Sequence, residues 1–254
     1  MTAVAVKKLR CEELTKSFDG VRALAGVTPE FPSSGLVAII GPNGAGKTTL
    51  LNVLTGFLRA ESGRFFLDGK ELTWVAPHKV ARQGISRTFQ DLRLIQQVTV
   101  LENVMLARPN QKGERLWHAL FRFGVAAEEA RNREEAMRLL RFVGLEEKAQ
   151  EAAGELSYGQ QKLLTLACCL ATEARILLLD EPVAGVHPEM VAKILGLLRE
   201  LKAMGKLVVF IEHDIAAVCQ VADLVIVMDE GRIIAQGPPK EVLERPEIME
   251  AYVG

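Results

Sequence analysis

The chain has 254 residues, and its 31 Lys and Arg nearly balance its 32 Asp and Glu, which gives a formal net charge of −1. Hydrophobic residues make up 49% of the chain and charged residues 25%. This balance is that of an ordinary globular protein, and it excludes a disordered or low-complexity chain. The near-neutral charge also argues against a general nucleic-acid binder, because such proteins usually carry a basic excess.

Membrane-spanning segments and disulfides are not expected. No apolar run approaches the roughly 20 residues that a membrane helix needs, and the start of the chain lacks the apolar stretch of a secretory signal. We therefore expect the protein to stay in the cytosol. The cysteines show no ligand spacing, so neither structural disulfides nor a zinc site is expected; they are Cys11, Cys168, Cys169 and Cys219.

The first third of the chain predicts short strands around a glycine-rich break. The run 36–40 is apolar throughout, as in a strand buried on both faces. A glycine-rich break follows at 41–46, and a helix begins after it. Further strands are expected over 9–17, 27–31, 64–67 and 85–89. Helices are expected over 48–54 and from Pro77 to about Gly84, and turns at 19–20 and 68–69.

The middle of the chain changes to helices, and the last third alternates. Helices are expected over 100–107, 116–123 and 127–143, with Gly144 as a C-cap. Beyond about residue 175, we expect strands over 176–179, 207–211, 224–228 and 232–236, separated by helices over 188–204 and 214–221 and followed by one over 240–243. Such alternation implies a mostly parallel α/β sheet, here with an inserted helical block.

A phosphate-binding loop is predicted at residues 41–48, which read Gly-Pro-Asn-Gly-Ala-Gly-Lys-Thr and match G-x-x-x-x-G-K-[ST] in full. The motif lies between a buried strand and a helix, which is the context it requires. Its backbone N–H groups would surround the β-phosphate, Lys47 would reach the β- and γ-phosphates, and Thr48 would bind Mg²⁺. The alternative, a glycine-rich turn without a ligand, is disfavoured by the complete pattern.

An acidic pair, Asp180 and Glu181, follows the apolar run at 176–179. Ligands of parallel α/β sheets bind at the carboxyl ends of the strands, where these acids are expected. Asp180 would hold the Mg²⁺ shell, and Glu181 would polarise a water against the γ-phosphate. Alone, this pattern would equally fit a strand that ends in a solvated acidic turn; the phosphate loop favours the catalytic interpretation.

Residues 156–161, Leu-Ser-Tyr-Gly-Gln-Gln, resemble the signature motif of ATP-binding cassette (ABC) proteins, with Tyr158 where most members have glycine. Three single residues fit the same family. Gln90 resembles its Q-loop glutamine, His213 its switch histidine, and Phe18 the aromatic residue that stacks on adenine. Each alone would fit an ordinary structural role, but the motifs follow one another in the family's order from about residue 9 to 237.

The resemblance implies a P-loop NTPase fold: a RecA-like, mostly parallel core, an N-terminal antiparallel β-subdomain and a helical subdomain over roughly 91–172. The whole chain, 1–254, would be one nucleotide-binding domain without a C-terminal regulatory domain. ATP and Mg²⁺ would be its ligands. The implied catalytic residues are Glu181, His213 and Gln90, and the implied metal-site residues are Thr48, Gln90 and Asp180. The implied nucleotide contacts are Phe18, Gly41, Pro42, Asn43, Gly44, Ala45, Gly46, Lys47, Thr48, Thr49, Ser157, Gly159 and Gln160.

Family members work as head-to-tail pairs, in which the signature of one subunit completes the ATP site of the other. With one cassette and no membrane span, this chain looks like the separate ATPase subunit of an importer. The form of its signature, the insertion over 108–134 and the ending over 248–254 resemble the subunits for branched-chain amino acids. A lipopolysaccharide exporter ATPase and a non-transport ABC ATPase of translation or DNA repair are the alternatives.

The implied partners are integral-membrane permeases, a second ABC ATPase subunit and, indirectly, an extracytoplasmic solute-binding protein, with no nucleic acid. The chain would lie on the cytoplasmic face of the cell membrane as a peripheral subunit. Two features stay open. The apolar residues of 116–123 would face either a permease or their own helical block. His187 stands where the family's D-loop commonly has aspartate, as a tolerated change or as an adaptation to a different partner subunit.

Overall fold

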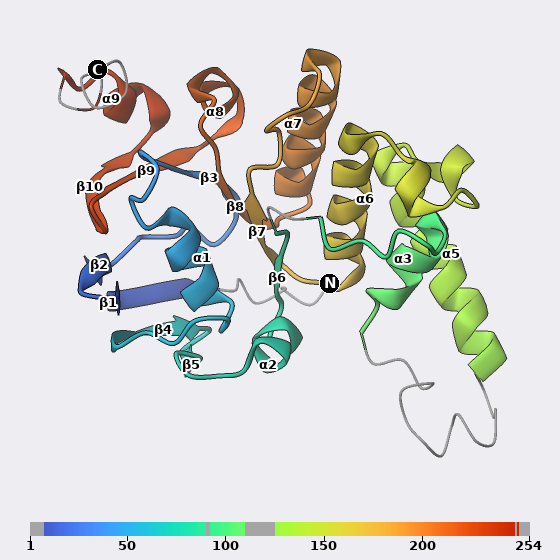
Figure 1. Cartoon of the computed structure of the whole chain (residues 1–254), viewed down its shortest axis with the longest axis horizontal. Helices are drawn as coiled ribbons and strands as arrows, with labels where there is room; N and C mark the ends of the chain where they lie inside the picture. Colours follow the sequence, from blue (N-terminus) through green and yellow to red (C-terminus); the bar gives the residue numbers. More distant parts are fainter. Residues whose placement is uncertain (1–7, 90–91, 110–124, 247, 249–254) are drawn as a thin grey trace. The chain divides into compact units, whose positions relative to one another are not determined.

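The computed structural model describes residues 8–89, 92–109, 125–246 and 248 (Figure 1). The chain divides into two compact units, which are described separately here. The first unit comprises Met1–Arg87, Arg175–Ala184 and Pro188–Gly254. The second unit comprises Thr88–Ala174 and Gly185–His187. Within the described residues, no helix combines the length and the apolar character needed to cross a membrane.

The first unit contains two sheets. The smaller sheet is antiparallel in the order β2-β1-β4-β5, with strands β1 (Leu9–Phe18), β2 (Val21–Val27), β4 (Ser62–Leu67) and β5 (Lys70–Glu71). The larger sheet has the order β10-β9-β3-β8-β7-β6 and is parallel except for β10. Its strands are β3 (Gly35–Ile40), β6 (Ile85–Arg87), β7 (Ile176–Asp180), β8 (Leu207–Ile211), β9 (Leu224–Asp229) and β10 (Arg232–Gly237).

Every residue of β3, β7 and β8 is buried, which explains why these strands read as continuous apolar runs rather than as alternating ones. In this part of the sheet β8 lies between β3 and β7, so the carboxyl ends of the three strands are neighbours. The helices of this unit are α1 (Lys47–Leu54), α2 (Pro77–Arg82), α7 (Pro188–Ala203), α8 (Ile215–Val221) and α9 (Pro239–Leu243).

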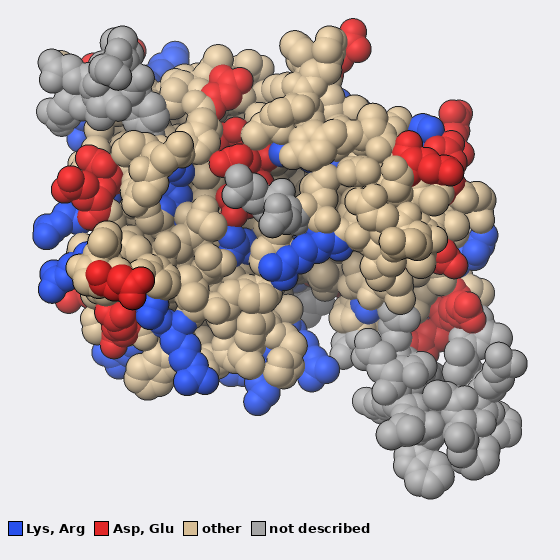
Figure 2. Space-filling view, viewed as in Figure 1, with Lys and Arg blue, Asp and Glu red and all other residues tan. Residues whose placement is uncertain are grey.

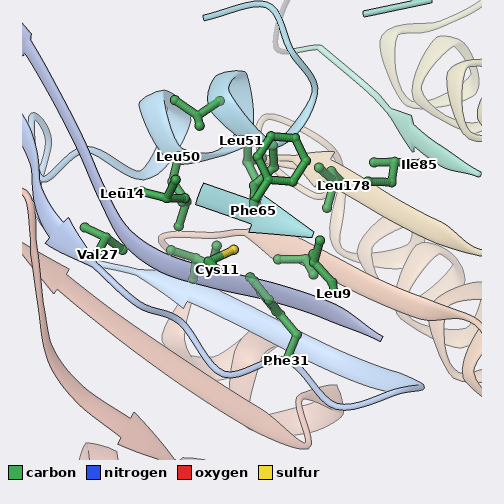
Figure 3. Packing of buried hydrophobic residues seen from close by; sticks show 14 of the residues in the cluster. Leu9, Cys11, Leu14, Val27, Phe31, Leu50, Leu51, Phe65, Ile85 and Leu178 are labelled. Atoms are coloured by element: carbon green, nitrogen blue, oxygen red, sulfur yellow. The ribbon is translucent and has the colours of Figure 1, made fainter. Parts of the chain in front are cut away.

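One hydrophobic cluster holds the two sheets of the first unit together through α1. Figure 3 shows Leu50 and Leu51 of this helix packed with Phe65 of β4, and Leu178 of β7 near the same group. Leu50, Leu51, Phe65 and Leu178 are all fully buried. Fully burying such side chains stabilises a fold by roughly 1.5–3 kcal/mol each. The helix that follows the predicted phosphate loop is therefore anchored firmly at its apolar face.

The second unit is helical where it is described. It contains α3 (Val100–Leu106), α5 (Val125–Val143), α6 (Tyr158–Ala171) and two short 3₁₀ turns at Glu146–Lys148 and Ala153–Glu155. A capping box starts α3: Thr99 accepts a hydrogen bond from the N–H of Glu102, whose side chain accepts one from Thr99.

Most elements lie where the sequence predicts them, and the observed α/β fold confirms the predicted fold class. The second strand is an exception: it was expected over 27–31 but runs over Val21–Val27. The turn at Asp19–Gly20 was placed correctly, and both residues have positive φ. Because this turn is tight, β2 starts directly after it and pairs with β1 from Val21 onward. The expected helix over 116–123 lies outside the described residues.

Candidate functional site

The predicted phosphate loop follows β3 directly and leads into α1. Gly41 has φ +153°, and a Cβ there would lie 2.0 Å from the backbone oxygen of Met228. Gly46 has φ +96°, and a Cβ there would lie 2.1 Å from the backbone oxygen of Ala23. Only glycine fits at either position, because each combines a left-handed backbone with a close backbone neighbour. The loop is therefore held in a shape that side chains would prevent.

Lys47 is the first residue of α1 and folds back over the loop. Its Nζ donates to the backbone oxygens of Gly41, at 2.8 Å, and Pro42, at 2.9 Å. Burial lowers the pKa of the ammonium group from its ordinary value, and the negative charges of Glu181 and Asp180 partly oppose this shift. Lys47 thus places its ammonium group at the mouth of the loop, where the charges of two carboxylates affect its pKa.

The acidic pair lies at the end of β7. Asp180 is its last residue, and only 2% of its side chain is exposed. Glu181 follows with φ +49°, a left-handed conformation that costs a residue other than glycine about 1 kcal/mol or more. Its backbone N–H donates to the oxygen of Ile211 at 3.1 Å, so β8 holds this turn. The left-handed residue ends the strand at Asp180 and starts the turn that follows it.

Glu212 is a third carboxylate in this region, and the motifs did not single it out. It is 2% exposed and accepts a hydrogen bond from the backbone N–H of Val183 at 2.7 Å. Its other oxygen lies 3.3 Å from the backbone N–H of His213. Glu212 therefore ties the chain just after Glu181 to the end of β8. One feature of the sequence could have identified Glu212: it is a charged residue directly after a run of apolar residues. Burying a charge costs free energy unless the charge is paired, so a partner for Glu212 could have been expected.

His213 and Glu181 face each other across the ends of β8 and β7. Nε2 of His213 lies 3.4 Å from Oε1 of Glu181, and their side chains are 42% and 24% exposed. Both groups therefore remain open to solvent on one side. At this separation the acid and the imidazole contact each other directly, and both can reach a ligand from their exposed sides.

Phe18 ends β1 and is 43% exposed, which is unusual for a phenylalanine. The ammonium of Lys16 lies 5.2 Å from its ring centroid. An exposed ring in the unit that carries the phosphate loop is a suitable stacking surface for an adenine base. This contact stays a prediction.

The signature residues belong to the second unit, where Ser157 caps α6. Its hydroxyl accepts from the N–H of Gln160 at 3.4 Å, and the Gln160 side chain accepts from the N–H of Ser157 at 3.0 Å. Ser157 and Gln160, two of the predicted nucleotide contacts, thus form a capping box, which the sequence pattern Ser-x-x-Gln predicts. Tyr158, with 47% of its surface exposed, lies against Gly185, where a Cβ would come within 3.3 Å of the tyrosine ring.

The structure places most of the predicted site residues in the first unit, and all of these except Phe18, which ends β1, follow or end β3, β7 and β8. Gln90 lies outside the described residues. The first-unit residues are Phe18, Gly41, Pro42, Asn43, Gly44, Ala45, Gly46, Lys47, Thr48, Thr49, Asp180, Glu181 and His213, whereas Ser157, Gly159 and Gln160 lie in the second unit.

Mg²⁺ fits the oxygen donors of the first unit. In the described part of the chain, no three His, Cys, Asp or Glu side chains are grouped as a ready metal site. Thr48 and Asp180 supply a hydroxyl and a carboxylate, both hard oxygen ligands. Mg²⁺ is commonly bound by one or two such groups together with waters and substrate phosphates. Thr48 and Asp180 therefore suit a Mg²⁺ ion that binds together with a nucleotide.

Comparison with known proteins identifies the family. A family model described as ABC transporter matches residues 24–184. The chain belongs to the ABC transporter family. It is 39% identical over 249 residues to a probable branched-chain amino acid transport ATP-binding protein LivG of Archaeoglobus fulgidus, covering 98% of this chain and 96% of the relative. It is 38% identical over 248 residues to the high-affinity branched-chain amino acid transport ATP-binding protein BraF of Pseudomonas aeruginosa, covering 97% of each.

Solved structures agree with this assignment. A nucleotide-free ATP-binding cassette from an ABC transporter is 38% identical, with a TM-score of 0.85, covering 98% of this chain and 99% of that one. A dimeric cassette, MJ0796, in a post-hydrolysis state with ADP and phosphate, is 25% identical, with a TM-score of 0.77, covering 91% and 98%. The chain is therefore an ABC ATPase with a P-loop NTPase fold, as the motifs predicted.

Proposed function

We propose that this ABC ATPase powers the uptake of branched-chain amino acids through separate membrane permeases. The observation that carries its catalytic part is the contact of Glu181 with His213 at the ends of β7 and β8. Lys47 lies near enough for the charges of Glu181 and Asp180 to oppose the lowering of its pKa by burial. The relatives named above support the substrate class, because both are described as branched-chain amino acid transport ATP-binding proteins.

In the proposed reaction, the phosphate loop binds the nucleotide. Its backbone N–H groups and Lys47 bind the phosphates, and Phe18 stacks on the adenine. The ammonium of Lys47 donates to the oxygens of Gly41 and Pro42, and its third N–H can donate to a phosphate. The N-terminus of α1 favours the anion as well.

Hydrolysis is assigned to the residues at the strand ends. Thr48 and Asp180 would hold Mg²⁺, which neutralises charge on the β- and γ-phosphates. Glu181 orients and deprotonates the attacking water, and His213 stabilises the γ-phosphate from the end of the neighbouring strand. Gln90 is assigned to the metal and the γ-phosphate by family resemblance alone.

We further propose that two cassettes close around ATP, with Ser157, Gly159 and Gln160 of one contacting the γ-phosphate bound to the other. The capping box leaves the first N–H groups of α6 at a helix start that favours anions. ATP would then stabilise the dimer because it binds both halves at once. The permeases hold the pair at the cytoplasmic face of the membrane, and a solute-binding protein delivers the amino acid from outside.

The substrate assignment can be tested by uptake in cells. A strain without this gene should lose high-affinity uptake of labelled leucine, isoleucine and valine but keep lysine uptake. The wild-type gene should restore uptake, and Glu181→Gln should not. Unchanged uptake of all three amino acids in the deletion strain would reject the substrate. Altered surface lipopolysaccharide instead would favour the exporter alternative.

A further inference from the structure

A buried arginine contacts the predicted magnesium ligand of this site. Arg87 is the last residue of β6, and only 4% of its side chain is exposed. Its guanidinium donates to Oδ2 of Asp180 at 2.7 Å and to Oδ1 of Asn52 at 2.6 Å. None of the motifs assigns Arg87 or Asn52 a role.

Stability alone explains this arrangement poorly. Taking an arginine and an aspartate out of water costs several kcal/mol per ion, and their attraction often only balances that cost. An apolar pair of similar volume would serve packing as well. The retention of two charges at the end of β7 is therefore better explained by what they do there.

The three residues join the two elements that carry the predicted magnesium ligands. Asn52 lies on α1, four residues after Thr48, so both side chains lie on one face of the helix. Asp180 ends β7. Arg87 spans from one element to the other, and its rigid planar fork suits two acceptors in fixed directions. It thereby sets where the Asp180 carboxylate stands relative to Thr48.

A hydrogen bond from Arg87 does not by itself prevent a carboxylate from binding a cation. Arg87 contacts Oδ2, and a carboxylate has two oxygens with about four acceptor sites in all. A ligand that is held by a hydrogen bond on one oxygen can approach a metal with the other. Residues that orient metal ligands in this way typically affect metal affinity about 10–100-fold.

We propose that Arg87 is a positioning residue that fixes the Asp180 carboxylate against Thr48 for Mg²⁺ bound with a nucleotide. This inference rests on the proposed function, because it concerns the same site. In this proposal Arg87 acts through Asp180. Asn52 completes the link by anchoring the guanidinium to the helix of the phosphate loop.

The test compares nucleotide affinity with and without the metal. A fluorescent ATP analogue is titrated into wild type and Arg87→Met, in excess Mg²⁺ and in EDTA. We expect the variant to lose about 10–100-fold in affinity in Mg²⁺ and to keep wild-type affinity in EDTA. Arg87→Lys, which keeps the charge without the fork, should recover only part of the loss. Arg82→Met, at an exposed arginine of α2, is the matched control and should change neither arm.

A second comparison guards against misfolding, because Arg87→Met leaves Asp180 buried without this partner. In an Asp180→Asn background, adding Arg87→Met should cause no further loss in Mg²⁺, since the two residues act as one unit. The inference is overturned if Arg87→Met loses the same nucleotide affinity in EDTA as in Mg²⁺, or if its affinity in Mg²⁺ equals that of the wild type. It is also overturned if the losses of affinity caused by Arg87→Met and Asp180→Asn add up in the double variant. A wild type without nucleotide binding in either arm would instead overturn the proposed function, and a wild type without a Mg²⁺ effect would overturn both.

Discussion

At the scale of single residues, hydrogen bonds with the surrounding backbone hold Glu181 and Lys47 in place. Glu181 sits in a left-handed conformation that its strand neighbours maintain, and Lys47 is kept near the loop by two carbonyl oxygens. Such local strain persists because the neighbouring strands β3, β7 and β8 are fully buried and fix the backbone around it. The fold of the first unit therefore holds Glu181 and Lys47 in place by itself.

Replacement of the proposed general base should separate binding from hydrolysis. Glu181→Gln keeps the size and most of the polarity of the side chain but cannot take a proton from water. We expect ATP hydrolysis to fall by about 10²–10⁴ and ATP affinity to be retained. Phosphate release measures the first and equilibrium titration the second. Near-wild-type turnover would remove Glu181 from its assigned role.

Replacement of the phosphate-loop lysine should abolish binding itself. Lys47→Ala removes the cation that compensates the β- and γ-phosphate charges. We expect no measurable ATP binding at concentrations that saturate the wild type, with an intact fold by circular dichroism, because the ammonium bonds only to loop carbonyls. Equal ATP affinity of the two proteins in titration would count against this site.

At the scale of elements, the ends of β7 and β8 are joined by Glu212. Its carboxylate accepts hydrogen bonds from the backbone on both sides of the site, at Val183 and His213. The turn that carries Glu181 is thus bonded to the segment that carries His213. A change at Glu212 should act on both catalytic groups, although Glu212 is assigned no contact with the substrate.

Glu212→Ala tests this link. Leaving the buried N–H of Val183 without its acceptor costs about 1–3 kcal/mol, so we expect lower stability and a lower kcat. Glu212→Gln keeps an oxygen for Val183 and should recover most of both. Denaturant unfolding and steady-state kinetics measure the two effects, with Glu200→Ala on the exposed side of α7 as control. If Glu212→Ala unfolds at the wild-type denaturant concentration with wild-type kcat, the turn does not depend on Glu212.

The elements also show what the sequence could and could not predict. β8 was placed correctly because its five apolar residues lie between polar neighbours. β2 was misplaced because it is an edge strand, whose position depends on pairing with β1 more than on its own pattern. The motif residues were found because phosphate binding requires a fixed local spacing. The contacts of Arg87 join residues 35 and 93 positions apart, and no local pattern encodes them.

At the scale of the whole molecule, the chain carries half of what the proposed reaction needs at each ATP. The phosphate loop and the acidic pair belong to the first unit, and the signature belongs to the second unit. In the proposed dimer, each ATP site combines the phosphate loop and acids of one subunit with the signature of the other. Figure 2 shows acidic and basic side chains interspersed over the visible face of the first unit, in keeping with a net charge of −1. The net charge of the chain therefore gives no guide to the partner subunit, and single residues must be considered.

His187 is one such residue. It is exposed, and it stands where the family's D-loop commonly has an aspartate. That loop crosses the interface in the family's dimers and helps to orient the opposite site, where histidine cannot supply the fixed negative charge of aspartate. We predict that the partner is a different cassette subunit. The isolated chain should then have weak ATPase activity as a homodimer and be stimulated by its sister subunit.

The measurement is ATPase activity per site for the chain alone, and for the chain with its sister cassette and permeases. His187→Asp should raise the activity of the chain alone and lower the gain on assembly, because the loop then suits a copy of itself. His78→Asp places the same change at an exposed histidine of α2 and should alter neither activity. If the wild-type chain alone is as fast as the complex, the heterodimer prediction fails. If His187→Asp changes neither setting, the loop backbone alone serves the interface and the side chain has no part in partner choice.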